Sequence, residues 1–193
     1  MKKTFFYCLA FLLLLSCNSK KEDNNRTKKT GKNEYTITKD GINDLKIGMT
    51  KEEVEKLLDQ HFDMDAKKDS AGYWSDTIKT KYKTLDVALY FERQYVTQDS
   101  GYMQLNGIET SSPLCSTNTG ISIGDTKHDI LPAYEENPIN MGYDYEMVND
   151  TTWAPSKTKY SINVKDDKWD RELIFHLMNN KITSIQASVI MGD

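Results

Sequence analysis

The sequence lacks a hydrophobic run long enough to cross a membrane. Its N-terminal apolar run, residues 5–15, has eleven residues. At about 1.5 Å per helical residue, the run reaches only halfway across a bilayer core of about 30 Å. A run of this length behind Lys2 and Lys3 is typical of a signal-peptide core. The segment therefore predicts export and excludes a membrane-spanning helix at this position.

The apolar run ends in Leu14-Leu15-Ser16-Cys17, which resembles a lipobox. A small residue before the cysteine lets the signal peptidase approach, and the cysteine thiol accepts the diacylglycerol. We expect residues 1–16 to be a signal peptide and Cys17 to carry the lipid, including palmitate, that holds the mature chain on a membrane. The alternative is an ordinary secretory signal with an accidental cysteine.

Large apolar residues are missing between the predicted lipidation site and Lys32, where Lys, Asn and Thr are frequent. Such a segment cannot bury enough surface to offset chain entropy, so we expect residues 17–34 to be a flexible tether. Lys21-Glu22-Asp23 resembles the signal that marks surface-exposed lipoproteins in some Gram-negative lineages, but a generic polar tether explains it equally well. We therefore expect the protein in the cell envelope, on the outer membrane, facing either the periplasm or the cell surface.

Cysteine is scarce, with only three in the chain. Removal of the signal peptide takes Cys8, and the lipid uses Cys17, so only Cys115 remains in the mature body. An internal disulfide is therefore excluded, and the fold must depend on packing. Cys115 is either a reactive thiol or a small apolar residue of the interior, and the missing neighbouring base favours the second interpretation.

Positive charge is also scarce in the body of the protein. The formal charge of the whole chain is −4, but the signal peptide and the tether hold much of the positive charge, so the body from Tyr35 onward is near −9. Nucleic-acid binding draws on positive charge at the phosphates. We therefore expect no nucleic-acid partner.

Catalytic signatures are missing as well. The sequence has no G-x-S-x-G, P-loop, H-E-x-x-H, C-x-x-C or G-x-G-x-x-G motif. Its three histidines, His61, His128 and His176, are widely separated. Asp125, His128 and Asp129 would share a helix face and could hold a metal, but acidic residues in a first helical turn usually serve the helix dipole. We expect no catalytic residue, no metal and no cofactor.

A repeated segment is the main positive signal. Residues 45–54 return as residues 121–130, with identical Gly, Thr and Lys at positions 48, 50 and 51 and again at 124, 126 and 127. Thr50 with Glu53, and Thr126 with Asp129, have the spacing of a helix-capping box. Each copy therefore predicts a helix start, and Pro132 is expected to kink or shorten the second helix.

After each predicted helix the hydrophobic period changes to two. This pattern predicts strands at 87–91, 102–108, 159–164, 172–178 and 182–190, with a hairpin turn at Asn179-Asn180. We therefore predict an α+β fold of two tandem units, 35–112 and 113–193. Each unit is a short helical segment followed by an antiparallel β-meander, and the helices pack on one side of a shared sheet.

The motif Leu/Ile-x-Ile-Gly-x-Thr-Lys, at 45–51 and 121–127, followed by a helix and a meander, resembles the tandem repeats of the beta-lactamase-inhibitor-protein-like superfamily. That superfamily includes the outer-membrane-assembly lipoproteins of the SmpA/OmlA type. The resemblance covers residues 35–193 and implies a protein that binds other proteins through an exposed sheet face. The chain departs from it at residues 135–155, which are longer and more aromatic than a connection needs.

Aromatic residues are plentiful, with eleven Tyr and three Trp. Tyr143, Tyr145 and Trp153 fall in the segment rich in Gly, Pro and Asn, although the general preference of strands for aromatic residues is the alternative explanation. Tyr and Trp are enriched at interfaces because each combines a large contact area with a polar tip. These three residues are the predicted partner-binding site.

The sequence therefore favours a non-catalytic, lipid-anchored envelope protein that binds another envelope protein or assists assembly. The alternative is an envelope hydrolase or a small-ligand receptor on the same fold, which would need a deep site with convergent polar groups, such as His61 or His128. A purely structural or immunity-type lipoprotein also stays open.

Overall fold

The computed structural model describes residues 34–64, 67–68, 74–97, 100–149 and 151–190. The expected signal peptide, the tether up to residue 33 and the predicted lipidation site Cys17 lie outside the described residues. Within the described part, the chain forms twelve strands and two short helices. None of the helices in this part is both long and apolar enough to span a bilayer.

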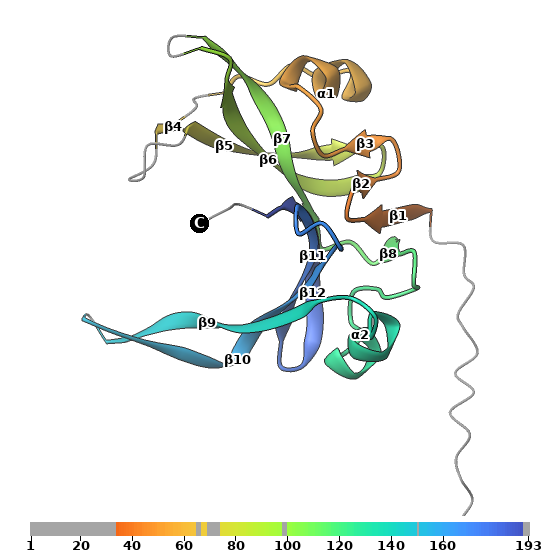
Figure 1. Cartoon of the computed structure of the whole chain (residues 1–193), viewed down its shortest axis with the longest axis vertical. Coiled ribbons are helices and arrows are strands. Elements are labelled where there is room, and N and C mark those ends of the chain that lie inside the picture. The colour runs from red at the N-terminus through yellow and green to blue at the C-terminus, as the bar shows by residue number, and fades with distance from the viewer. Residues whose placement is uncertain (1–33, 65–66, 69–73, 98–99, 150, 191–193) are drawn as a thin grey trace, which may run out of the picture.

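The strands form two sheets (Figure 1). The smaller sheet has the order β3-β2-β1-β8 and contains β1 (Tyr35–Thr38), β2 (Gly41–Ile42), β3 (Leu45–Lys46) and β8 (Cys115–Thr117). The larger sheet has the order β4-β5-β6-β7-β12-β11-β10-β9 and contains β4 (Lys67–Lys68), β5 (Trp74–Tyr82), β6 (Leu85–Tyr95), β7 (Gly101–Thr110), β9 (Ile139–Asn149), β10 (Thr152–Lys165), β11 (Arg171–Met178) and β12 (Lys181–Val189). The helices are α1 (Lys51–Leu58) and α2 (Lys127–Ala133).

The predicted fold class, an α+β fold of two tandem helix-and-meander units, is wrong. The molecule is mostly β, and its two helices are only about two turns each. Val54 in α1 and Ile130 in α2 are the fully buried helical residues, so the helices contribute little of the core. The prediction also missed the smaller sheet, in which β1 pairs in parallel with β8 although about 75 residues separate them.

The repeated segment nevertheless has the same local geometry in both copies. Before α1, Gly48 N donates to Leu105 O at 2.8 Å, and Leu105 N donates back to Met49 O at 2.8 Å. Before α2, the chain makes the same exchange with Ile182: Gly124 N donates to Ile182 O at 2.9 Å, and Ile182 N donates to Asp125 O at 2.8 Å. The two bonds join each helix start to a central strand, β7 or β12.

Glycine is required at both of these positions by the backbone. Gly48 has a φ of 94° and Gly124 a φ of 90°, and residues with a side chain seldom adopt such a left-handed conformation. The helix caps follow directly. Thr50 N donates to the Glu53 carboxylate at 2.8 Å and Thr126 N to the Asp129 carboxylate at 2.9 Å.

The predicted strands are confirmed as parts of β6, β7, β10, β11 and β12. The predicted turn is confirmed too, since Met178 pairs with Lys181 around Asn179 and Asn180, which both have positive φ. Such a two-residue turn matches the right-handed twist of the strands it joins.

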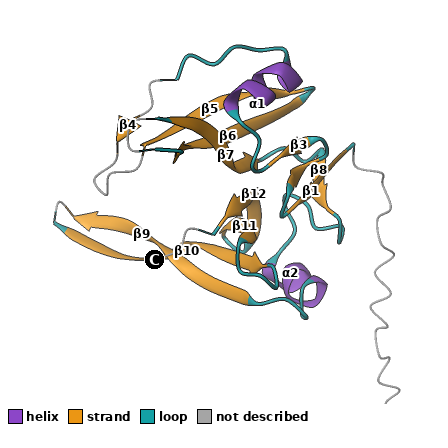
Figure 2. Ribbon diagram, turned by 45° about the horizontal axis from the view of Figure 1, so that its top comes forward, coloured by secondary structure: helices purple, strands orange, loops and turns teal. Residues whose placement is uncertain are grey.

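The core lies between the larger sheet and the layer formed by α1, α2 and the smaller sheet. Every second residue of β6 from Leu85 to Phe91 is buried, and the same alternation continues in β11 and β12. Figures 1 and 2 show α1 beside one part of the large sheet and α2 beside another, while β9 and β10 run out beyond α2. The helices therefore leave the end of the sheet uncovered.

Replacement of Phe91 by Ala should destabilise the protein. Its ring is fully buried and lies 6.2 Å from that of Phe62, centroid to centroid. Loss of a buried aromatic side chain costs about 3–5 kcal/mol, so urea denaturation should show a fall of that size in the free energy of unfolding. Tyr95→Ala is the control on the same strand, with a 52% exposed side chain and an expected change below about 1 kcal/mol. An equal fall in the free energy of unfolding for Phe91→Ala and Tyr95→Ala would contradict the burial of Phe91 in the core.

Candidate protein-binding surface

Strands β9 and β10 form a two-stranded ribbon that projects from the large sheet. Strand β10 pairs with β9 from Thr152 onward, but its pairing with β11 begins only at Lys159. A bulge separates the two parts of β10, between Pro155 and Tyr160. Beyond the bulge, therefore, β9 and β10 pair only with each other, and no third described strand lies beside them.

One face of the ribbon is apolar from Met141 to Met147. Residues opposite each other in an antiparallel pair place their side chains on the same face. Tyr143 pairs with Tyr160, Tyr145 with Pro155, and Met147 with Trp153. We call this surface the apolar ribbon face; its exposed members are Met141, Tyr143, Tyr145, Met147 and Trp153.

The apolar ribbon face continues the face of the sheet that α2 covers. Tyr160, at the base of the ribbon, is buried, and its hydroxyl donates to Asn180 Oδ1 at 2.8 Å. The ring of Tyr143 lies 6.0 Å from the ring of Tyr160, yet Tyr143 itself is 58% exposed. Further out, Tyr145 is 66% and Trp153 is 60% exposed. The part of the sheet covered by α2 therefore ends near Tyr160, whereas the apolar face continues to Met147 and Trp153.

The three residues predicted as a partner-binding site, Tyr143, Tyr145 and Trp153, are therefore brought together on one exposed surface. The sequence suggests a long aromatic connection at residues 135–155, but most of this segment forms β9 and the start of β10. The prediction missed Met141 and Met147, which are 47% and 54% exposed. The alternation of Met, Tyr, Tyr and Met at positions 141, 143, 145 and 147 was the available signal.

The opposite face of β9 is acidic. Gly142, Asp144 and Glu146 alternate with the apolar residues and point to the other side of the ribbon. No described residue forms an ion pair with Asp144 or Glu146. The two carboxylates therefore give this acidic ribbon face a local negative charge with no partner in the described part of the chain.

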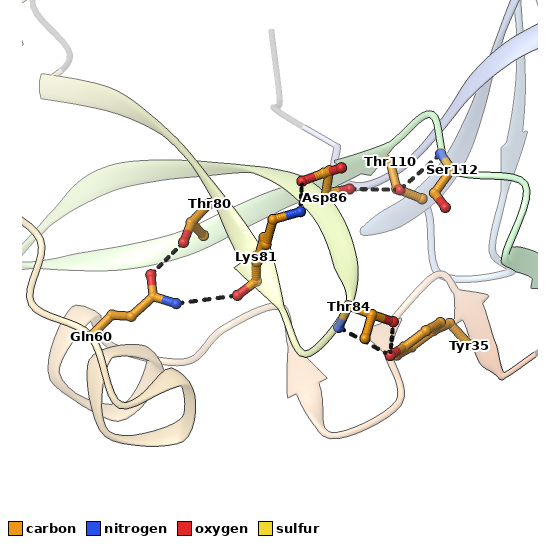
Figure 3. Close-up of polar contacts among 8 residues, drawn as sticks. All are labelled: Tyr35, Gln60, Thr80, Lys81, Thr84, Asp86, Thr110 and Ser112. Atoms are coloured by element: carbon orange, nitrogen blue, oxygen red, sulfur yellow. Dashed lines mark hydrogen bonds and ion pairs between the residues drawn. The ribbon is translucent and has the colours of Figure 1, made fainter.

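A concave region of about 830 Å³ lies elsewhere, against β5, β6 and the end of β7. Figure 3 shows that its polar side chains bond to one another. Gln60 contacts Thr80 and donates to Lys81 O, Lys81 pairs with Asp86 at 2.6 Å, and Thr110 donates to Asp86 O at 2.8 Å. Gln60, Lys81 and Asp86 are therefore engaged with one another or with the backbone, while Lys79 and Ser111 also line the region.

Tyr90 and Glu109 line the same concave region and hydrogen-bond to each other. Burial, together with the hydrogen bond to Glu109, raises the pKa of the Tyr90 hydroxyl well above its ordinary value. Tyr90 therefore stays protonated and acts as a donor to Glu109. A hydroxyl held protonated in this way is unsuited to act as a general base.

The three histidines lie apart from one another in the structure, each with different neighbours. His61 is 83% exposed in its side chain and lies 2.9 Å from Glu55, whose carboxylate also accepts from Lys51 and from Phe62 N. The hydrogen bond from Lys51 lowers the pKa of Glu55, so Glu55 is an ionised partner at the end of α1. His61 is therefore part of a helix-end contact.

His128 is exposed and borders a shallow concave region of about 420 Å³ at the base of the ribbon, together with Tyr143 and Tyr160. The neighbouring carboxylates accept hydrogen bonds from backbone N–H groups. Asp125 accepts from Ser122 N at 2.9 Å, and Asp129 accepts from Thr126 N. No group of three metal-binding side chains occurs in the described residues. His176 Nε2 lies 3.4 Å from Gln186 Oε1.

Cys115 lies fully buried on β8, and burial raises the pKa of its thiol to about 12. The thiol is therefore neutral at pH 8, where only the thiolate would react. We expect Cys115 to resist iodoacetamide at pH 8 in the folded protein and to react fully in urea, as read by peptide mass spectrometry. Rapid modification of the folded protein at pH 8 would contradict this environment.

No known protein family matches the chain, and no curated protein or solved structure matches it either.

Proposed function

We propose that the protein is a non-catalytic, lipid-anchored lipoprotein of the cell envelope that binds another envelope protein through the apolar ribbon face. The observation that carries this proposal is the row of five exposed apolar side chains on β9 and β10. Monomeric proteins seldom expose a contiguous apolar surface unless it serves an interaction. Tyr and Trp are also the residues that most often dominate the binding energy of an interface.

The anchor supports the same proposal. Lipid on Cys17 would hold the body near a membrane, and the tether would let the ribbon reach a partner in the same envelope. The resemblance to the superfamily that includes the SmpA/OmlA-type lipoproteins stays a prediction, and the proposed role does not depend on it.

The alternative role as a hydrolase or small-ligand receptor has less support. Its best candidates, His61 and His128, both lie on open surface. Several polar groups of the larger concave region bond to one another, and the smaller region is bordered by the ribbon residues Met141 and Tyr143. No observation in the described part of the chain favours chemistry over binding.

Crosslinking of the tagged full chain in native envelopes, followed by affinity capture and mass spectrometry, tests the proposal. The double variant Tyr143→Ala, Trp153→Ala should lower recovery of the main partner about tenfold or more, because truncation of central aromatic residues often costs 2 kcal/mol or more, roughly thirtyfold in affinity. Both residues are exposed, so the fold should persist.

The matched control is Tyr95→Ala, Tyr102→Ala, which removes two exposed aromatic residues from the other long hairpin, β6 and β7. Recovery should be unchanged. Cys17→Ala should release the protein from the membrane fraction and lower recovery without altering the ribbon. A partner set that is the same with and without the ribbon aromatics would overturn the proposal, as would the lack of any partner for well-anchored protein.

A further inference from the structure

Strand β9 is the outermost strand of the large sheet. It pairs with β10 on one side, and no described strand lies on its other side. Its eleven residues make it one of the longest strands of the sheet. An edge strand of this kind presents alternating backbone N–H and C=O groups that can accept a further strand. No described residue bonds to the outward backbone groups of Met141 to Val148.

Two other free edges of this sheet carry protection against strand pairing. The free part of β10 holds Pro155, which has no backbone N–H, and next to it the bulge and Lys157. The edge of β5 beyond its short pairing with β4 is occupied by Gln60, which bonds to Lys81 O and to the Thr80 side chain (Figure 3). Proline, bulges, lysine and covering side chains are the usual means of blocking an edge.

Strand β9 has no proline and no lysine, and its own register shift lies only near its outer end, at Val148. Its sequence, INMGYDYEMVN, contains no Lys, Arg or Pro, and no bulge interrupts its inner part between Gly142 and Ile139. Strand β9 thus lacks the protection that Pro155 and the bulge give to β10 and that Gln60 gives to the end of β5. An open edge next to an exposed apolar face indicates that a strand is added there.

The two faces of β9 define the chemistry of that strand. Tyr143, Tyr145 and Met147 point to one side, and Asp144 and Glu146 point to the other. An added strand with apolar side chains on the first side and basic side chains on the second would pair favourably on both, because cross-strand neighbours interact directly. Glycine at position 142 adds no side chain to the acidic side, and a Cβ there would meet open space.

A second copy of this chain is a poorer occupant. In a fully overlapping antiparallel pair of two β9 strands, Asp144 of one copy lies opposite Asp144 of the other. A shift by two residues in one direction places Asp144 opposite Glu146, and in the other direction it places Asp144 opposite Gly142, where the charge gains no partner. Like charges directly opposite each other destabilise a strand pair, so charge complementarity favours a different, basic strand.

We propose that β9 binds its partner by strand addition, and that the bound segment of the partner is an extended stretch in which basic and apolar side chains alternate. This inference rests on the proposed binding function and specifies the partner's chemistry. Hydrogen bonds from the backbone of β9 would bind an added strand of any sequence. Contacts with the acidic ribbon face and the apolar ribbon face would determine which partner sequence binds best.

The test uses the full chain in detergent and three ten-residue peptides: alternating Lys and Val, the same composition arranged as a Lys block and a Val block, and alternating Glu and Val. Binding is measured by titration, and its site by amide hydrogen exchange. The alternating Lys–Val peptide should protect the amides of β9 and bind about tenfold more tightly than the Glu–Val peptide. Lysine opposite Asp144 and Glu146 forms attractive cross-strand pairs, whereas glutamate at the same places forms repulsive ones. The block peptide should protect β9 weakly.

The variant Asp144→Lys, Glu146→Lys should invert the preference between the Lys–Val and Glu–Val peptides. The matched control is Glu135→Lys, Glu136→Lys, which makes the same change in net charge at two exposed positions outside the ribbon. It should leave the preference unchanged, which separates a local contact from a general effect of charge.

Three results would overturn strand addition: no protection of β9 by any peptide, equal affinity for the Lys–Val and Glu–Val peptides, or protection of β9 that grows with protein concentration alone, which would indicate a second copy. These outcomes are independent of the capture experiment. A partner that is lost with Tyr143 and Trp153 but leaves β9 unprotected would preserve the binding function and exclude the strand mechanism.

Discussion

The position of both helices depends on one repeated exchange of backbone hydrogen bonds. Leu105 of β7 bonds to the loop before α1, and Ile182 of β12 bonds to the loop before α2. Because β7 and β12 are neighbours at the centre of the large sheet, both helix starts are fixed near its middle. Two helices of about two turns each cannot reach the ends of an eight-stranded sheet from there, so its outer part remains without cover.

The uncovered part explains the distribution of the aromatic residues. Along β11 and β12 the apolar side of each strand is buried, and at the base of β10 it is still buried at Tyr160. The same side continues on β9 through Tyr143 to Met147, where nothing in the described part of the chain lies over it. Apolar burial contributes roughly 25 cal/mol per Å², so an apolar surface of this extent gains most when a partner covers it.

The sequence predicted the local features well and the fold class badly. The caps at Thr50 and Thr126 and the turn at Asn179 depend on neighbours within a few residues, and all are present. The parallel pairing of Tyr35 with Cys115 is non-local and leaves no periodic trace, so the smaller sheet was missed. The strand β9 was hidden because Gly142, Asp144 and the flanking Asn residues are poor strand formers, although Tyr143, Tyr145 and Trp153 were recognised.

Site-specific photocrosslinking in intact cells tests the central claim most directly. A photoreactive phenylalanine replaces Tyr145, at the tip of the apolar ribbon face, and in a parallel strain it replaces Tyr95, an aromatic residue of similar exposure on β6. The account predicts one discrete, light-dependent adduct with another protein at position 145 and none at position 95. No adduct at position 145, or equal adducts at both positions, would contradict the view that the ribbon is the binding surface.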